Sequence, residues 1–147
     1  AILDDGPCHV GVESTILGLS DTPALLRPGG VAQEQIETTL GQPLVTAKDG
    51  KITAPGQLVS HYAPKAKVRL NATSRTPGEI LLGFGETNGD LTLSASGDLQ
   101  EAAANLFEML HKLDQTGCPI AVAPIPNTDL GHAINDRLRR AAAPRDS

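Results

Sequence analysis

Pro119-Ile120-Ala121-Val122-Ala123-Pro124-Ile125 is an almost uninterrupted apolar run near the end of a chain of 147 residues. Such a run, without the alternation of a half-exposed strand, is typical of a central strand in a parallel sheet. Parallel neighbours need crossover connections, which are usually helices. The run therefore predicts an α/β layer, and the flanking sequence should supply its helices.

Helical patterns lie on both sides of this run. The upstream pattern predicts a helix capped by Ser96 or Asp98 and ended by Gly117, because these residue types favour helix ends. Helical spacing places six residues on its inner face: Leu99, Ala103, Leu106, Phe107, Leu110 and Leu113. The downstream pattern predicts a helix over Leu130–Ala142, capped by Thr128 or Asp129 and turned inward at Ile134 and Leu138.

Further upstream, short strands are predicted at Lys67–Leu70, Glu79–Phe84 and Leu91–Leu93. The predicted order is then strand, strand, strand, helix, strand, helix, which indicates a small α/β domain with crossover units. Gly83-Phe84-Gly85 lacks the spacing of a phosphate-binding loop, so we interpret it as structural.

The N-terminal third is predicted to hold strands at Val10–Leu19 and Ala24–Arg27, which could form a hairpin, and a helix at Val31–Leu40 ended by Gly41. These few elements cannot bury a core alone. They need the rest of a sheet, or the other domain, to cover them. Residues 42–64 show no periodicity and are rich in Gly and Pro, which indicates a linker or a functional segment.

The composition of the chain argues against several classes of function. The net charge of −5 gives no overall basic field for nucleic acid, and we interpret Arg137, Arg139 and Arg140 as a solvated helix end. Cys8 and Cys118 fit no metal or redox spacing, and no metal site is visible. No apolar run is long enough for a membrane span. The N-terminus resembles neither a signal peptide nor a translation start, so we expect the middle of a cytoplasmic protein.

Three positions are candidate binding residues, and each has a structural alternative. Ser14 could line a polar pocket or simply occupy a strand face. Arg27, before a Gly-rich turn, could bind phosphate or carboxylate, or it could be a surface residue. Tyr62 could stack on a base or pin the linker to a domain. No catalytic nucleophile is visible. The residues alone favour nucleotide or anion binding.

Four stretches taken together are more specific: Gly6-Pro7-Cys8 with Gly11–Ile16, Leu25–Gly29, Ala54-Pro55-Gly56 with His61-Tyr62-Ala63-Pro64, and Ala123–Pro126 with Ala133–Leu138. In this order they resemble the C-terminal half of the threonylcarbamoyl-AMP synthase family in its long, two-domain form. The resemblance covers essentially the whole chain. Gln57 and Gly18 depart from the family's common Met and Asp.

The resemblance implies an α/β fold in three parts: the tail of a YrdC-like catalytic domain at residues 1–45, a linker at 46–65, and a small Rossmann-like domain at 66–147. The family makes threonylcarbamoyl-AMP and pyrophosphate from L-threonine, bicarbonate and ATP, for the t6A modification of tRNA. By resemblance, Ser14 contacts L-threonine, while Arg27 and Tyr62 contact ATP, whose phosphates would carry Mg²⁺.

The family's N-terminal motif, with its ATP-binding Lys and Arg, is not in this sequence. We therefore expect the isolated chain to be inactive without an N-terminal catalytic portion. The alternative is a non-catalytic regulatory or interaction module. The acidic balance allows at most a weak contact with tRNA.

Overall fold

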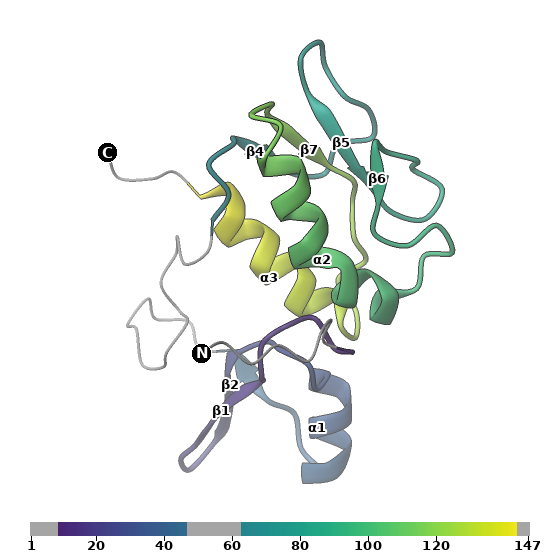
Figure 1. Ribbon diagram of the computed structural model, residues 1–147. Coiled ribbons are helices and arrows are strands. Elements are labelled where there is room, and N and C mark those ends of the chain that lie inside the picture. Colours follow the sequence, from purple (N-terminus) through teal and green to yellow (C-terminus); the bar gives the residue numbers. More distant parts are fainter. Residues whose placement is uncertain (1–8, 47–62, 144–147) are drawn as a thin grey trace, which may run out of the picture.

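The computed structural model describes residues 9–46 and 63–143. Predictions that concern His61, Tyr62, Cys8 and most of the linker lie outside the described residues. The described residues form two sheets and three helices (Figure 1), whose elements are, in chain order, β1 Ile16–Leu19, β2 Pro23–Arg27, α1 Gln33–Leu40, β3 Val45–Thr46, β4 Val68–Arg69, β5 Ile80–Gly83, β6 Leu91–Thr92, α2 Leu99–Asp114, β7 Ile120–Val122 and α3 Gly131–Ala142.

The C-terminal region, residues 63–143, is built on a four-stranded sheet in the order β4-β7-β5-β6. Every pairing in it is parallel, and Ile120 of β7 stands opposite both Val68 of β4 and Ile80 of β5. The apolar run from Pro119 therefore does supply an inner strand of a parallel sheet, as predicted. The fold is mixed α/β, with α2 and α3 on the same side of the sheet (Figure 1).

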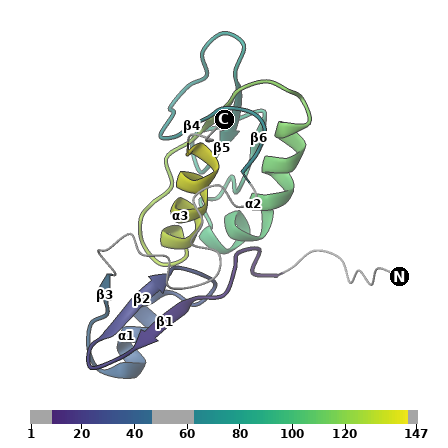
Figure 2. The same cartoon turned by 90° about the vertical axis from the view of Figure 1, so that its left-hand side faces the viewer.

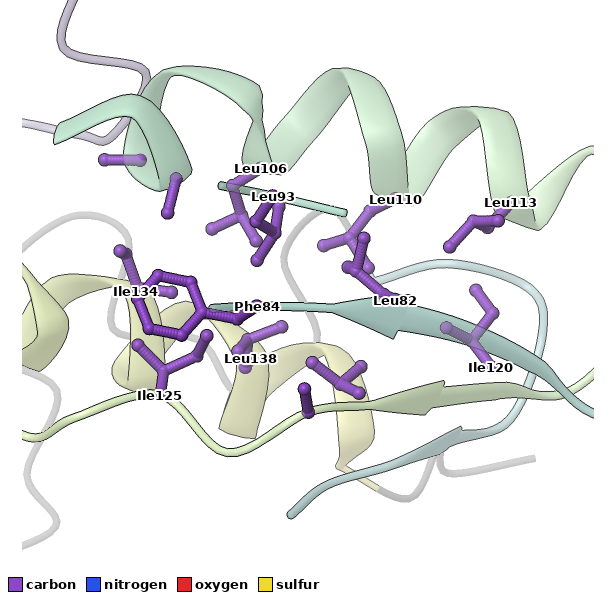
Figure 3. Close-up of a cluster of buried hydrophobic side chains, with 14 residues drawn as sticks. Leu82, Phe84, Leu93, Leu106, Leu110, Leu113, Ile120, Ile125, Ile134 and Leu138 are labelled. Atoms are coloured by element: carbon purple, nitrogen blue, oxygen red, sulfur yellow. The ribbon is translucent and has the colours of Figure 1, made fainter. Parts of the chain in front are cut away.

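One hydrophobic core fills the space between these two helices and the sheet. Leu110 of α2 faces Leu82 of β5, Leu106 lies beside Leu93, and Ile134 of α3 lies beside Phe84 (Figure 3). The other face of the sheet holds a much smaller cluster of Ala72, Leu81 and Ala121. Because side chains alternate along β7, its residues are divided between the two clusters.

The ends of the two long helices differ. Asp98 caps α2 as predicted, since its carboxylate accepts hydrogen bonds from the backbone N–H groups of Gln100 and Glu101 at 2.7 and 3.0 Å. The prediction for α3 was wrong: its N-cap is Leu130, and no side chain caps it. Asp129 cannot fill that role because its φ of 50° lies in the left-handed region.

The burial of Phe107 and the burial of Arg137 are both the opposite of what the sequence predicted. Phe107 was predicted to face the core but is partly exposed, whereas Arg137, predicted to be solvated, is buried. The Arg137 guanidinium lies 4.6 Å from the centre of the Phe107 ring. A cation over an aromatic face is stabilising, so the ring serves as a cover for the arginine and not as a core residue.

In the N-terminal region, residues 9–46, β1 and β2 form the antiparallel hairpin that the sequence suggested. A third strand, β3, pairs in parallel with β2 through Ala24–Val45 and Leu25–Thr46. Strand β3 was not predicted, because the sequence after Gly41 shows no periodicity. Helix α1 begins at Gln33, two residues later than predicted, and ends at Leu40 with Gly41 as its C-cap, as expected.

The two regions touch where α2 and α3 begin (Figure 2). Gly11 approaches α2 so closely that a Cβ atom there would lie 2.1 Å from the backbone oxygen of Ala103. On the other side, Glu34 of α1 lies 3.5 Å from His132 of α3 and accepts a hydrogen bond from the Asp129 backbone N–H at 3.4 Å. We call these contacts the junction.

Candidate functional site

Arg27 and Ser14, which are 13 positions apart in the sequence, are joined directly. Both Nε and Nη2 of Arg27 donate to the backbone oxygen of Ser14, at 3.2 and 2.8 Å, and Nη2 also reaches the Ser14 hydroxyl at 3.4 Å. The hairpin makes this possible, because Arg27 ends β2 and Ser14 comes just before β1. Two of the three predicted binding residues are therefore brought together.

The turn after Arg27 is held against the same segment. The Gly30 backbone N–H donates to the Glu13 oxygen at 2.8 Å. The Thr15 hydroxyl donates to the Val31 oxygen at 2.7 Å and accepts from the Val31 N–H at 3.1 Å. A Cβ atom on Gly29 would lie only 2.3 to 2.4 Å from backbone atoms of residues 13–15. Only glycine allows this approach, so the turn presses directly on the backbone of Ser14.

The charge at this site is partly balanced. Arg27 is only 8 % exposed, and Nη1 lies 3.7 Å from a carboxylate oxygen of Glu13. A buried guanidinium needs such partners to offset its desolvation. Glu13 was not among the residues that the sequence predicted for the site. The only signal in the sequence is that Glu13 directly precedes the candidate residue Ser14.

We name the segments Glu13–Thr15 and Arg27–Val31 together the hairpin site. They bring a cation, a hydroxyl, a carboxylate and a rigid Gly-rich turn into one place. Such groups can bind and orient an oxyanion or a hydroxyl-bearing ligand. Tyr62, the third predicted residue, lies outside the described residues.

Residues 9–46 and 63–143 hold neither a metal-binding cluster nor a membrane-spanning helix. That part of the chain gathers no group of three His, Cys, Asp or Glu side chains that could hold a metal. Cys118 is a free thiol in the described structure. No helix in the described ranges has the length and apolarity to cross a membrane.

The junction contains one perturbed carboxyl group. A hydrogen bond to its own backbone lowers the pKa of Glu34 below the usual 4.5, and the Asp129 backbone N–H and the His132 charge act in the same direction against partial desolvation. The anionic form of Glu34 is thus the form that links α1 to α3.

Residues 31–143 match the family model described as threonylcarbamoyl-AMP synthase, C-terminal domain. The chain is 33 % identical to the threonylcarbamoyl-AMP synthase of Pyrococcus abyssi (strain GE5 / Orsay), with 98 % of the chain and 49 % of the relative covered. It is 32 % identical to the enzyme of the same name in Bacillus subtilis (strain 168), with the same coverage.

The fold is also found among solved structures. A crystal structure of P. abyssi Sua5 complexed with L-threonine superposes with a TM-score of 0.78 and 30 % sequence identity, over 95 % of this chain and 48 % of that chain. The chain therefore spans about half the length of the curated relatives it matches.

Proposed function

The chain belongs to the threonylcarbamoyl-AMP synthase C-terminal domain family, and from that membership we propose that it forms the C-terminal half of an L-threonylcarbamoyladenylate synthase. The reaction would be a nucleotidyl transfer that joins L-threonine, bicarbonate and ATP into threonylcarbamoyl-AMP, with release of pyrophosphate. The product would serve t6A formation in tRNA in the cytoplasm. In this proposal residues 1–45 belong to the catalytic domain, 46–65 to the linker and 66–147 to the C-terminal domain.

The observation that carries the proposal is the hydrogen-bonded pair of Arg27 and Ser14. In the proposal the Ser14 hydroxyl contacts L-threonine, while the Arg27 guanidinium offsets phosphate charge of ATP and holds the Ser14 backbone. One cation would thus set the distance between two substrates. Adenylyl transfer gains mainly from such positioning and charge neutralisation.

Tyr62 would reach over bound ATP and help keep water away from the labile adenylate. Mg²⁺ would reach the site on the phosphates of ATP, because the described residues offer no ligand set of their own and Mg²⁺ is commonly held by substrate phosphates. The remaining substrate contacts would come from an N-terminal catalytic portion. The isolated chain would be inactive, and its net charge of −5 would allow only weak tRNA binding.

A chimera tests this proposal. The chain is fused behind the N-terminal half of the P. abyssi relative, and pyrophosphate release is measured with ATP, bicarbonate and L-threonine. We expect L-threonine-dependent release by the chimera and none by the isolated chain. Arg27→Ala should lower kcat/KM by roughly a hundredfold, because a buried charge-assisted contact is lost. Arg75→Ala, which removes an exposed arginine paired with Asp90, is the matched control.

The results separate the proposal from its alternative. Loss of activity in both arginine variants would count against a specific role for Arg27. Full activity of Arg27→Ala in a folded chimera would favour a non-catalytic regulatory or interaction module. Robust turnover by the isolated chain would contradict its expected inactivity.

A further inference from the structure

A second polar site lies far from the hairpin site in sequence, at the carboxyl edge of the parallel sheet. The chain leaves the adjacent strands β4 and β7 toward opposite faces. After β4 it passes to the face that carries Ala72, which packs with Leu81 and Ala121. After β7 it passes to α3, on the face of the main core. Connections that diverge in this way open a crevice at the carboxyl ends of the strands, where α/β proteins bind ligands.

The structure contains a cavity of about 250 Å³ at this point. Its wall combines residues that follow β4, residues that follow β7, and residues of α3. The apolar part of the wall is formed by Leu70, Ala123, Ile125 and Leu138, and the polar part by Asn71, Asn127, Asn135 and Arg139. Small-molecule sites combine apolar surface with placed polar groups, and here polar side chains form half of the lining.

The polar groups offer donors. The NH₂ group of Asn135 donates to the Ile125 backbone oxygen at 3.0 Å and to Oδ1 of Asn127 at 3.3 Å. The side-chain oxygen of Asn127 is therefore occupied, while the NH₂ group of Asn127 has no partner in the described structure. The side chain of Asn71 makes no hydrogen bond to any described residue; its backbone takes a φ of 55°, which Asn tolerates.

Arg139 adds a positive charge that has no close carboxylate partner in the described structure. Its nearest carboxylate oxygen, on Asp136, is 4.0 Å away, beyond hydrogen-bond distance. Asp136 is instead bound by Arg140 at 2.6 Å. The crevice therefore presents a guanidinium and two amide NH₂ groups, all of which suit an acceptor with negative charge.

We propose that the crevice between β4, β7 and α3 binds a small oxyanion, a phosphate or a carboxylate group, through Arg139 with Asn71 and Asn127. The volume suits a group of this size and is below that of the usual site for a drug-sized ligand. The site adjoins the junction, since Asn127 is close in sequence to Asp129, which donates to Glu34. It is independent of the proposed catalytic role of the hairpin site.

The test uses the 147-residue chain labelled with ¹⁵N. Sodium phosphate and sodium acetate are titrated separately at constant ionic strength against sodium chloride. Side-chain signals of Asn71, Asn127 and Arg139 are followed by NMR. We expect saturable shifts at these positions with at least one anion. Saturation by phosphate alone assigns a phosphoryl ligand, and saturation by acetate alone assigns a carboxylate.

Variants establish where the anion binds. Arg139→Gln should weaken the affinity at least tenfold. Asn71→Gly keeps a residue that accepts positive φ and should weaken it several-fold. Lys112→Gln removes an equally exposed cation of α2 and should leave the affinity unchanged. Shifts that grow linearly with both anions, or an unchanged affinity in Arg139→Gln, would overturn the proposal.

Discussion

The two regions of the molecule bury their apolar residues to very different extents. The C-terminal region encloses a core of 14 buried residues between one sheet and two helices. In the N-terminal region α1 has no buried residue at all. The large exposed hydrophobic residues of the described structure reflect this contrast, because only Phe107 is C-terminal and the others are N-terminal: Val10, Leu19, Val31, Leu40 and Val45.

The C-terminal region therefore has a hydrophobic core of its own, whereas the N-terminal region needs another surface to cover its apolar residues. The few elements of the N-terminal region cannot bury a core alone. In the proposed function, the catalytic portion of the enzyme would cover the N-terminal sheet and helix. The hairpin site would then lie between two partners, whereas the oxyanion crevice lies within the C-terminal region alone.

The largest expected effect comes from opening the C-terminal core. Leu106→Ala removes a side chain that is fully buried and should lower the free energy of unfolding by about 3 to 5 kcal/mol. Leu25→Ala, at a buried N-terminal position outside the main core, should cost about 2 kcal/mol, the lower end of the range for buried leucines. Urea denaturation followed by circular dichroism measures both. Equal losses would contradict the contrast between the regions.

A smaller effect is expected at the junction. Gly11→Ala places a Cβ atom against the α2 backbone and also requires a φ of 64°, so the N-terminal segment should detach from α2. Hydrogen exchange should then accelerate in residues 9–46 and stay unchanged in β5, β7 and α2. Gly41→Ala has a similar φ but no atom within 4 Å of the new Cβ, so it controls for backbone strain. If both variants exchange alike, the close contact at Gly11 has no role in holding the regions together.

The smallest effect is expected when the pH is lowered. Because the pKa of Glu34 is lowered, its stabilising contacts are complete above about pH 4.5 and are lost as the pH falls through the lowered value. The junction should therefore loosen in this window, and Glu34→Gln should remove the dependence. This loosening of the junction can be followed through the NMR signals of Asp129 and His132.

Glu79 is the matched carboxyl group within the C-terminal region. Hydrogen bonds from Arg69 and from Thr76 lower the pKa of Glu79 to about 2, so its contacts should persist until the pH approaches 2. If Asp129 and His132 show no change before Glu79 titrates, Glu34 does not hold the junction.

The sequence predicted the elements whose signals are local. The apolar run at Ile120 and the capping carboxylate of Asp98 each act within a few residues, and both predictions were confirmed. The helical spacing of α2 was confirmed as well, except at Phe107. Strand β3 was missed, because two residues become a strand only when β2 lies beside them. The environments of Phe107 and Arg137 were also predicted wrongly. Helical spacing shows which residues share a face, but it does not show which neighbouring side chain covers a charge.

For the site, the sequence identified Ser14 and Arg27 separately, and the roles of both residues remain predictions. Their hydrogen bonds depend on the hairpin register and on the close approach of Gly29. The oxyanion crevice could not be predicted, because its residues meet only through the order of the strands. Asn71 and Asn127 carry no motif in the sequence.

That strand order also has a consequence for how the protein is made. A ribosome delivers β4, β5 and β6 long before β7, yet β7 is the strand that stands between β4 and β5. Until residue 122 has left the exit tunnel, β4 has no neighbour in its sheet and β5 has only β6. The nascent chain must keep these apolar edges unpaired while α2 is synthesised, which is the interval in which a chaperone would have most to protect.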